Sequence, residues 1–368
     1  VDARPPSDAP PRSKMCRLMV YYGPPIRMDE LTTKPTRSIV SQAMQSKERV
    51  QGNVNGDGFG VGWYDAAGAS PDEEPGVFTA VTPAWSNRNL GRLSRKIQSS
   101  LIFAHVRAAL PGMPVFESNC HPFVHGRYLF MHNGGIAHYG KIRRALQAAL
   151  PDPLFDMIQG TADSETAFAV FLSFLPDTDS LLPAVELQRA MALTLGRIEG
   201  LVAEAAARED LPAEHSLLNF VVSDGRTVVA TRFAGGSTTP ATLYFASGTE
   251  FTAQAVEGRR EYTMRHPALQ QFAAIVTSEP LSDSPDDWMP VPRNHMVTIL
   301  PETLAADADP RAPAAGAAAR PLRILMDRIE LPAPAGAGAG GGPAGGLAPG
   351  CFSREPSTAS EDAERFSA

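Results

Sequence analysis

The spacing of the apolar residues changes in the second half of this chain, from a helical period to a period of two. Apolar side chains recur every three to four residues over 163–175 and 184–207, which predicts two helices. Two alternating runs follow, 217–223 and 226–233, and they flank Asp224-Gly225, a dipeptide typical of a two-residue hairpin turn. Hairpin-linked strands pair antiparallel, and amphipathic helices must cover an apolar face. The pattern therefore predicts an α+β fold, with stacked antiparallel sheets and helices outside.

Further elements of both kinds are predicted along the rest of the chain. Helical spacing predicts helices over 38–50, 87–98 and 138–150. Short apolar runs predict strands over 16–22, 101–104, 128–131, 242–246, 272–277 and 296–300. Asp163 or Ser164 is placed to cap the helix that begins there.

Composition divides the chain into three parts. Residues 1–15 are rich in proline, serine and charge, and we interpret them as a disordered extension or a propeptide. Residues 16–304 form the predicted domain. Residues 305–368 are rich in alanine, proline and glycine and are predicted to be a disordered tail, with 322–331 as a candidate docking segment inside it.

Charge and cysteine content exclude several classes of protein. The net charge is −7 and no basic stripe is visible, so nucleic acid is not an expected partner. No apolar run reaches the roughly 18 residues that a membrane-spanning helix needs. The three cysteines, Cys16, Cys120 and Cys351, are odd in number and far apart, which argues against a disulfide framework and favours a reducing, cytoplasmic environment.

Cys16 follows Met15 directly and opens the first apolar run. If Met15 is the initiator and is removed, Cys16 carries a thiol nucleophile and a free α-amine in one residue. Such an amine titrates at about 7.7–8.0, in the range that a general base needs near neutral pH. The alternative is a small buried cysteine on a first strand, a frequent place for this residue type.

Polar residues at the ends of predicted strands are candidates for a binding site. Arg107 follows a buried apolar run, and its guanidinium suits a carboxylate, although a structural ion pair is an equal alternative. The Asn133 amide and the Gly134 N–H can together face a developing oxyanion, unless Asn133-Gly134-Gly135 is only a turn. Asp163 can hold an ammonium group or cap its helix.

The glycine-rich stretch 55–62 does not have the spacing of a dinucleotide-binding fingerprint. We interpret it as a loop that lets the backbone approach a small ligand. Histidines cluster nearby, at positions 105, 121, 125, 132 and 138, but their spacing matches no tight metal-ligand pair, so neither metal nor cofactor is expected. Cys120 is a second candidate nucleophile, without the surrounding residues typical of papain-like enzymes.

Several motifs occur in an order that resembles the class II glutamine amidotransferases, which are N-terminal-nucleophile hydrolases. They run from Met15 to about residue 300: Met15-Cys16-Arg17, Asn55-Gly56-Asp57-Gly58-Phe59-Gly60, Thr82-Pro83-Ala84-Trp85, His105-Val106-Arg107, Asn119-Cys120-His121-Pro122-Phe123, His132-Asn133-Gly134-Gly135, Asp163-Ser164-Glu165 and Ser278-Glu279-Pro280-Leu281. Within the family the chain resembles the amidotransferase-like subunits of glutathione-degrading (Dug) complexes.

The resemblance implies an αββα sandwich and a catalytic role for three residues. Cys16 would attack the γ-carbonyl of a glutamyl amide with its own amine as base, and Asn133 with the Gly134 N–H would form the oxyanion hole. Arg107 would bind the α-carboxylate of the substrate and Asp163 its α-ammonium. The expected substrate is a γ-glutamyl small molecule, glutamine or glutathione.

The chain departs from the family pattern at both ends. Residues precede Met15, so either Met15 is the true start, which we favour, or a propeptide is removed, or the chain is inactive. No synthetase-like domain follows residue 300. This suggests that the protein either hydrolyses its substrate outright or acts together with a separate, metallopeptidase-like partner subunit. The alternatives are a stand-alone glutaminase, a γ-glutamyl amidase of thiol metabolism such as those of ergothioneine synthesis, or an inactive regulatory or binding subunit.

Overall fold

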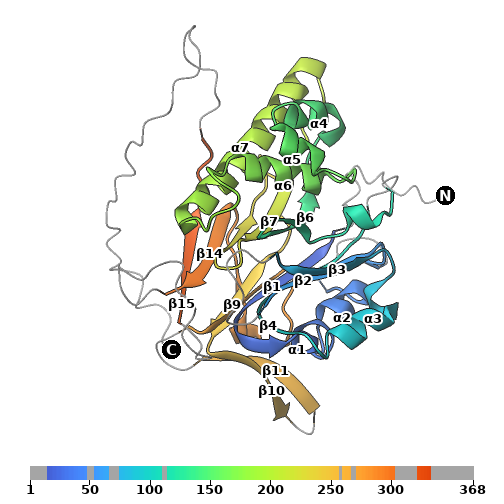
Figure 1. Ribbon diagram of the computed structural model, residues 1–368, viewed down its shortest axis with the longest axis vertical. Coiled ribbons are helices and arrows are strands. Elements are labelled where there is room, and N and C mark those ends of the chain that lie inside the picture. The colour runs from blue at the N-terminus through green and yellow to red at the C-terminus, as the bar shows by residue number, and fades with distance from the viewer. Residues whose placement is uncertain are drawn as a thin grey trace, which may run out of the picture. The chain divides into compact units, whose positions relative to one another are not determined.

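Two antiparallel sheets lie face to face in the computed structural model (Figure 1). It describes residues 15–47, 54–65, 74–109, 114–256, 259–266, 271–302 and 321–332, which fall within one structural unit. In spatial order, the first sheet contains β13 (Met289–Pro290), β9 (Tyr244–Gly248), β12 (Ala273–Thr277), β1 (Arg17–Arg27), β4 (Gln98–Val106), β2 (Phe59–Tyr64) and β3 (Gly76–Ala80). The second contains β15 (Leu322–Arg328), β14 (His295–Pro301), β8 (Val228–Arg232), β7 (Leu217–Ser223), β6 (Tyr128–Gly135) and β5 (Phe123–His125). A separate hairpin joins β10 (Glu250–Val256) to β11 (Arg259–Arg265).

Helices cover the outer face of each sheet (Figure 1). The first sheet is covered by α1 (Asp29–Thr32), α2 (Ile39–Met44) and α3 (Arg88–Leu93). The second is covered by α4 (Tyr139–Gln147), α5 (Asp152–Asp156), α6 (Asp163–Ser173) and α7 (Ala184–Glu209). Short 3-10 turns lie at η1 (Ala84–Ser86), η2 (Glu117–Asn119) and η3 (Pro285–Asp287).

Alternation along the central strand β1 produces this layering. Leu18 and Val20 point into the core between the sheets, where Leu129 and Met131 of β6 meet them. Met19 and Tyr21 point the opposite way, into the core beneath α1–α3, because successive side chains of a strand face opposite sides of the sheet. The predicted αββα sandwich is confirmed.

The helices 163–175 and 184–207 and the hairpin at Asp224-Gly225 were predicted with nearly the observed bounds. Two other helices are shorter than predicted. The helix α2 ends at Met44 rather than at residue 50. The helix α3 ends at Leu93, because Gln98, predicted to end it, already belongs to β4.

The segment 322–331 was predicted to lie within a disordered tail that begins at residue 305. This prediction is wrong for most of the segment, which is ordered. Leu322–Arg328 forms β15 and pairs along its whole length with β14. Ile329 then packs into the core beneath α7. The other residues assigned to the two terminal segments, 1–14, 305–320 and 333–368, lie outside the described residues. Within the described part of the chain, no helix has the length and apolar character needed to cross a bilayer.

Candidate active site

Cys16 lies immediately before the first residue of β1, which is the central strand of the first sheet. Its side chain is half-buried. Arg17, the next residue, pairs with Val106 of β4, which places Cys16 beside the segment that follows β4. There the Ala108 N–H donates to Cys16 Sγ at 3.4 Å, and the thiol lies 3.8 Å from the Ala108 carbonyl oxygen. Strand pairing thus brings Cys16 next to Arg107, as the predicted site requires.

Burial raises the pKa of the Cys16 thiol above its usual range, while the Ala108 amide and the Arg107 and Arg17 guanidiniums lower it and the Asp163 carboxylate raises it. The sulfur therefore lies within electrostatic range of both Arg107 and Asp163. Among the described residues, no imidazole or carboxylate hydrogen-bonds to it. A thiol in this environment needs a base to become a nucleophile.

Arg107 directly follows β4 and is almost completely buried. Its guanidinium contacts the carbonyl oxygens of Asp57 and Pro114, each at 3.4 Å, and forms no ion pair with any described carboxylate. The structural ion pair considered as an alternative is therefore absent from the described part of the chain. A buried guanidinium with two long contacts to neutral carbonyls retains the capacity to bind a carboxylate.

Asp163 does not cap its helix, which corrects that prediction. The N-cap of α6 is Ala162, which has no capping side chain, and Asn119 Oδ1 accepts the N–H groups of Thr161 and Ala162 just before it. Asp163 Oδ2 instead accepts the Ile136 N–H at 2.8 Å, and its Oδ1 accepts the Ser164 hydroxyl at 3.0 Å. Local sequence suggested a cap, but a neighbouring strand end provides a better donor.

His132 and His105 hold the surrounding framework together. His132 Nε2 lies 3.0 Å from the Leu217 carbonyl and Nδ1 lies 2.9 Å from Ser164 Oγ, so this ring links β6, β7 and α6. His105 Nε2 lies 3.1 Å from the His132 carbonyl, and burial lowers the pKa of His105 to about 3. Both rings thus serve as structural partners.

Asn133 and Gly134 belong to β6 rather than to a turn, which removes the alternative of a simple Asn-Gly-Gly turn. Asn133 pairs with Asn219 of β7, and its Nδ2 lies 3.1 Å from Ser278 Oγ. Gly134 has φ +152°, and a Cβ built on it would collide with the Leu217 carbonyl oxygen. The predicted oxyanion-hole residues are therefore held rigidly by the second sheet.

We expect Gly134→Ala to lower the free energy of unfolding by about 1–3 kcal/mol, because its methyl group meets backbone that cannot move away cheaply. Chemical denaturation measured against wild type tests this expectation. Gly140→Ala is the matched control, since nothing lies within 4 Å of its would-be Cβ. Equal midpoints for Gly134→Ala and wild type would contradict the close approach of β7.

Two glycines of the stretch 55–62 lie against neighbouring parts of the chain. A Cβ on Gly58 would lie 2.6 Å from Cys120 Sγ, and one on Gly60 would collide with the His121 carbonyl. Gly58 and Gly60 thus let this segment pack closely against residues 120 and 121, and the approach of a small ligand to the loop stays a prediction. The Asn55 side chain has a separate role, because its Nδ2 donates to the Met15 carbonyl at 2.9 Å.

A buried ion pair that the sequence did not assign supports the start of β1. Glu279 is completely buried and accepts from Arg17 Nε at 2.9 Å. Arg17 Nη1 in turn donates to the carbonyls of Cys16 at 2.9 Å and Met15 at 3.2 Å. Two features of the sequence could have indicated this pair: an arginine at the start of an apolar run, and a glutamate in Ser278-Glu279-Pro280-Leu281. Only the fold shows that the two side chains meet.

Cys120 does not have the environment of a nucleophile. Its side chain is buried, and burial raises the pKa of the thiol to about 11, so it stays protonated near neutral pH. The described residues also contain no group of three histidine, cysteine or carboxylate side chains placed to hold a metal ion.

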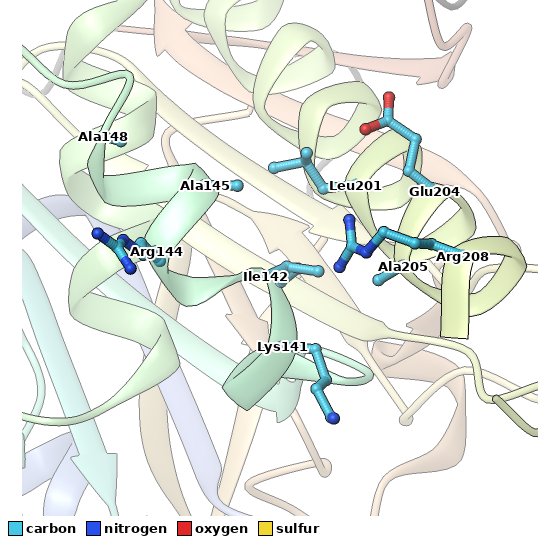
Figure 2. Close-up of a pocket in the computed structure, with 9 residues that line it drawn as sticks. All are labelled: Lys141, Ile142, Arg144, Ala145, Ala148, Leu201, Glu204, Ala205 and Arg208. Carbon is cyan, nitrogen blue, oxygen red and sulfur yellow. The ribbon is translucent and has the colours of Figure 1, made fainter. Parts of the chain in front are cut away.

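Two cavities lie away from Cys16. One, of about 340 Å³, lies between α4 and α7 and has an apolar floor with Lys141, Arg144 and Arg208 around it (Figure 2). The other, of about 420 Å³, is lined by residues of β3, η2 and β5 together with Glu165. Cys120 lines the second cavity, while Cys16, Arg107, Asn133, Gly134 and Asp163 line neither of the two.

The αββα sandwich carries Cys16 at the head of the central strand of its first sheet. The chain belongs to the class II glutamine amidotransferases, whose family model matches residues 31–320. It is 39% identical over 301 residues to the probable glutamine amidotransferase DUG3 of Saccharomyces cerevisiae, covering 79% of this chain and 83% of that protein. The family assignment made from the ordered motifs is confirmed.

Two further similarities concern a shorter stretch of the sequence and the fold. The gamma-glutamyl-hercynylcysteine sulfoxide hydrolase of Mycobacterium tuberculosis is 30% identical over 120 residues, which cover 33% of this chain and 49% of that protein. The fold is similar to that of a glutamine aminotransferase class-II domain protein from Silicibacter pomeroyi, with a TM-score of 0.52 and 23% identity over 86% of this chain and all of that one.

Proposed function

We propose that this protein hydrolyses γ-glutamyl amide bonds with Cys16 as nucleophile. The observation that carries the proposal is the position of the Cys16 thiol within electrostatic range of Arg107 and Asp163. A γ-glutamyl group has one α-carboxylate and one α-ammonium, and the site offers one guanidinium without a carboxylate partner among the described residues and one carboxylate. Both substrate charges can thus be bound while the γ-carbonyl is held near the sulfur.

The reaction follows from the chemistry of these groups. The Cys16 α-amine takes the thiol proton, and the sulfur attacks the γ-carbonyl carbon, whose π electrons move to oxygen. Asn133 and the Gly134 N–H stabilise this oxyanion, which then collapses and expels the amine with the proton held by the α-amine. Water attacks the resulting thioester by the same sequence, which releases glutamate and restores the thiol.

Glutathione, or another γ-glutamyl peptide, is our preferred substrate, with a metallopeptidase-like partner that would process the remaining peptide. Support comes from the similarity to DUG3 and from the γ-glutamyl compound in the name of the mycobacterial hydrolase. The separate cysteines lead us to propose a cytoplasmic location. A stand-alone glutaminase or γ-glutamyl amidase remains the alternative enzyme, and an inactive binding subunit the alternative of another class.

The proposed ammonium clamp predicts a change of substrate preference. Wild type should prefer γ-glutamyl-p-nitroanilide to glutaryl-p-nitroanilide, which lacks the α-ammonium, and Asp163→Asn should lose this preference. We expect kcat/KM for the glutamyl substrate to fall about 10²-fold, because a charge-assisted contact is lost and positioning suffers. Release of p-nitroaniline measures both substrates.

The exposed Asp156 at the end of α5 provides the matched control, Asp156→Asn. This control should keep the preference of wild type. If Asp163→Asn lowered the rate for both substrates equally, Asp163 would have a structural role and not bind the ammonium.

A further inference from the structure

Ser278 joins the two sheets beside Cys16. It follows β12 directly and is completely buried. Its N–H donates to the Leu18 carbonyl at 3.0 Å, and its Oγ accepts the Leu18 N–H at 3.1 Å. The same Oγ lies 3.1 Å from Nδ2 of Asn133, which belongs to the second sheet. Ser278 thus connects the strand that begins after Cys16 to the amide proposed for the oxyanion hole.

The hydrogen bonds at this junction do not balance when Nδ2 faces the serine. Ser278 Oγ then accepts two hydrogen bonds, and among the described residues nothing accepts its own hydroxyl proton. At the same time Asn133 Oδ1 is buried without any partner in that part of the chain. Two unsatisfied polar groups at adjacent buried atoms carry a cost of about 1–3 kcal/mol each.

Turning the amide by half a revolution removes both defects. The Ser278 hydroxyl then donates to Asn133 Oδ1 while it still accepts from the Leu18 N–H. The ends of an asparagine amide have nearly the same size, so the partner decides which of them faces the serine. The group left without a protein partner becomes the NH₂, a double donor that a developing oxyanion can satisfy.

We propose that Ser278 is a positioning residue that fixes the polarity of the Asn133 amide, with Oδ1 held by the serine and the NH₂ directed at the substrate. The inference rests on the proposed function, because it gives Asn133 the oxyanion. It also assigns a role to Ser278-Glu279-Pro280-Leu281: Glu279 holds Arg17 and the chain at Cys16, and Ser278 sets the amide that faces the reacting carbonyl.

A double-mutant cycle on hydrolysis of γ-glutamyl-p-nitroanilide tests this role. Asn133→Ala should lower kcat about 10²–10³-fold, the usual loss for one oxyanion donor. Ser278→Ala should lower kcat about 10–100-fold with KM nearly unchanged, because an amide free to turn still donates part of the time. In the Asn133→Ala background, Ser278→Ala should have no further effect, since the amide it orients is gone.

Binding of the γ-aldehyde of glutamate gives an independent readout. Cys16 adds to the aldehyde carbon, and the carbonyl oxygen receives the thiol proton in a thiohemiacetal that occupies the oxyanion position. Ser278→Ala should lower the affinity for this aldehyde at least tenfold and leave the affinity for glutamate unchanged. Ser278→Cys, which keeps the side chain's size with a weaker donor, should lie between alanine and wild type and serves where the alanine variant does not fold.

Thr277→Val is the matched control. Thr277 Oγ1 donates to the Leu18 and Glu279 carbonyls, so its loss disturbs the same junction without touching Asn133. It should lower the melting temperature but not kcat. If the losses in kcat multiplied in the double mutant, or if both Ser278 variants kept the aldehyde affinity of wild type, the inference about Ser278 would be overturned. The proposed function would stand. Absence of hydrolysis by wild type, or equal rates for wild type and Cys16→Ala, would remove the proposed function and this inference with it.

Discussion

Replacing Cys16 by alanine is expected to lower kcat for γ-glutamyl amides by about 10⁴–10⁶-fold, the size of effect seen when a covalent nucleophile is removed. The thiol lies beside the segment that carries Arg107 and within electrostatic range of Arg107 and Asp163. Those two residues remain in the variant, so the affinity for glutamate should be preserved. Glutamate release measures the first expectation, and isothermal titration measures the second.

Cys120→Ala is the control for this experiment. Cys120 is a buried thiol whose raised pKa, about 11, keeps it protonated, so its removal should leave most of the activity. If Cys16→Ala and wild type had comparable activity, the hypothesis of an enzyme would be ruled out, and the alternative of an inactive binding subunit would be favoured. Loss of activity only in Cys120→Ala would move the nucleophile to the papain-like alternative.

The second large effect is expected from the residue that precedes Cys16. A protein that begins at Cys16 should be faster by about 10²–10⁴-fold than one that retains residue 15, the range that a positioned general base contributes. In the longer form the nitrogen of Cys16 is an amide without basicity. The carbonyl of Met15 is then held by Asn55 Nδ2 at 2.9 Å and by Arg17 Nη1 at 3.2 Å, which fixes the chain before Cys16.

The rate of the protein that begins at Cys16 should also depend on pH, in a direction that the two titrating groups of Cys16 determine. Burial raises the pKa of the Cys16 thiol, so a ready-made thiolate is not available at neutral pH. The α-amine acts as a base only when it is neutral, so kcat/KM should rise with pH and level off above about 7.7–8.0, the usual range of an α-amine. Intact mass and kinetics of the same sample test both points. Full activity in protein that retains Met15 would show that the base lies elsewhere.

Several elements of this fold could be predicted because their signals are local. The turn at Asp224-Gly225 is an example: Asp224 Oδ1 accepts the N–H groups of Arg226 and Thr227, and Gly225 has φ +89°. The apolar stripe of α7 is another. The strand β15 was missed because its residues are surrounded by alanine, proline and glycine, and it becomes a strand only against the edge of β14.

The candidate site shows the same division. The order of the motifs identified Cys16, Arg107, Asn133, Gly134 and Asp163 together. Their roles stay proposals, and the kinetic experiments described above test those of Cys16, Asn133 and Asp163. The contacts of Asp163 could not be predicted, since the Ile136 N–H that it accepts lies on another element. Nor could those of Ser278 and Glu279, whose partners Leu18 and Arg17 are 260 and 262 residues away.

The sequence by itself determined the period of each main helix and strand, the family, and the set of residues proposed to hold a γ-glutamyl group. Only the tertiary structure decided that Asp163 is not a helix cap, that Arg107 forms no ion pair with a described carboxylate, and that Ser278 meets Asn133 across the two sheets. The physical reason is the range of the interactions. Periodicity and turns arise within a few residues, whereas a buried polar group takes whichever donor or acceptor the packed sheets bring within about 3 Å of it.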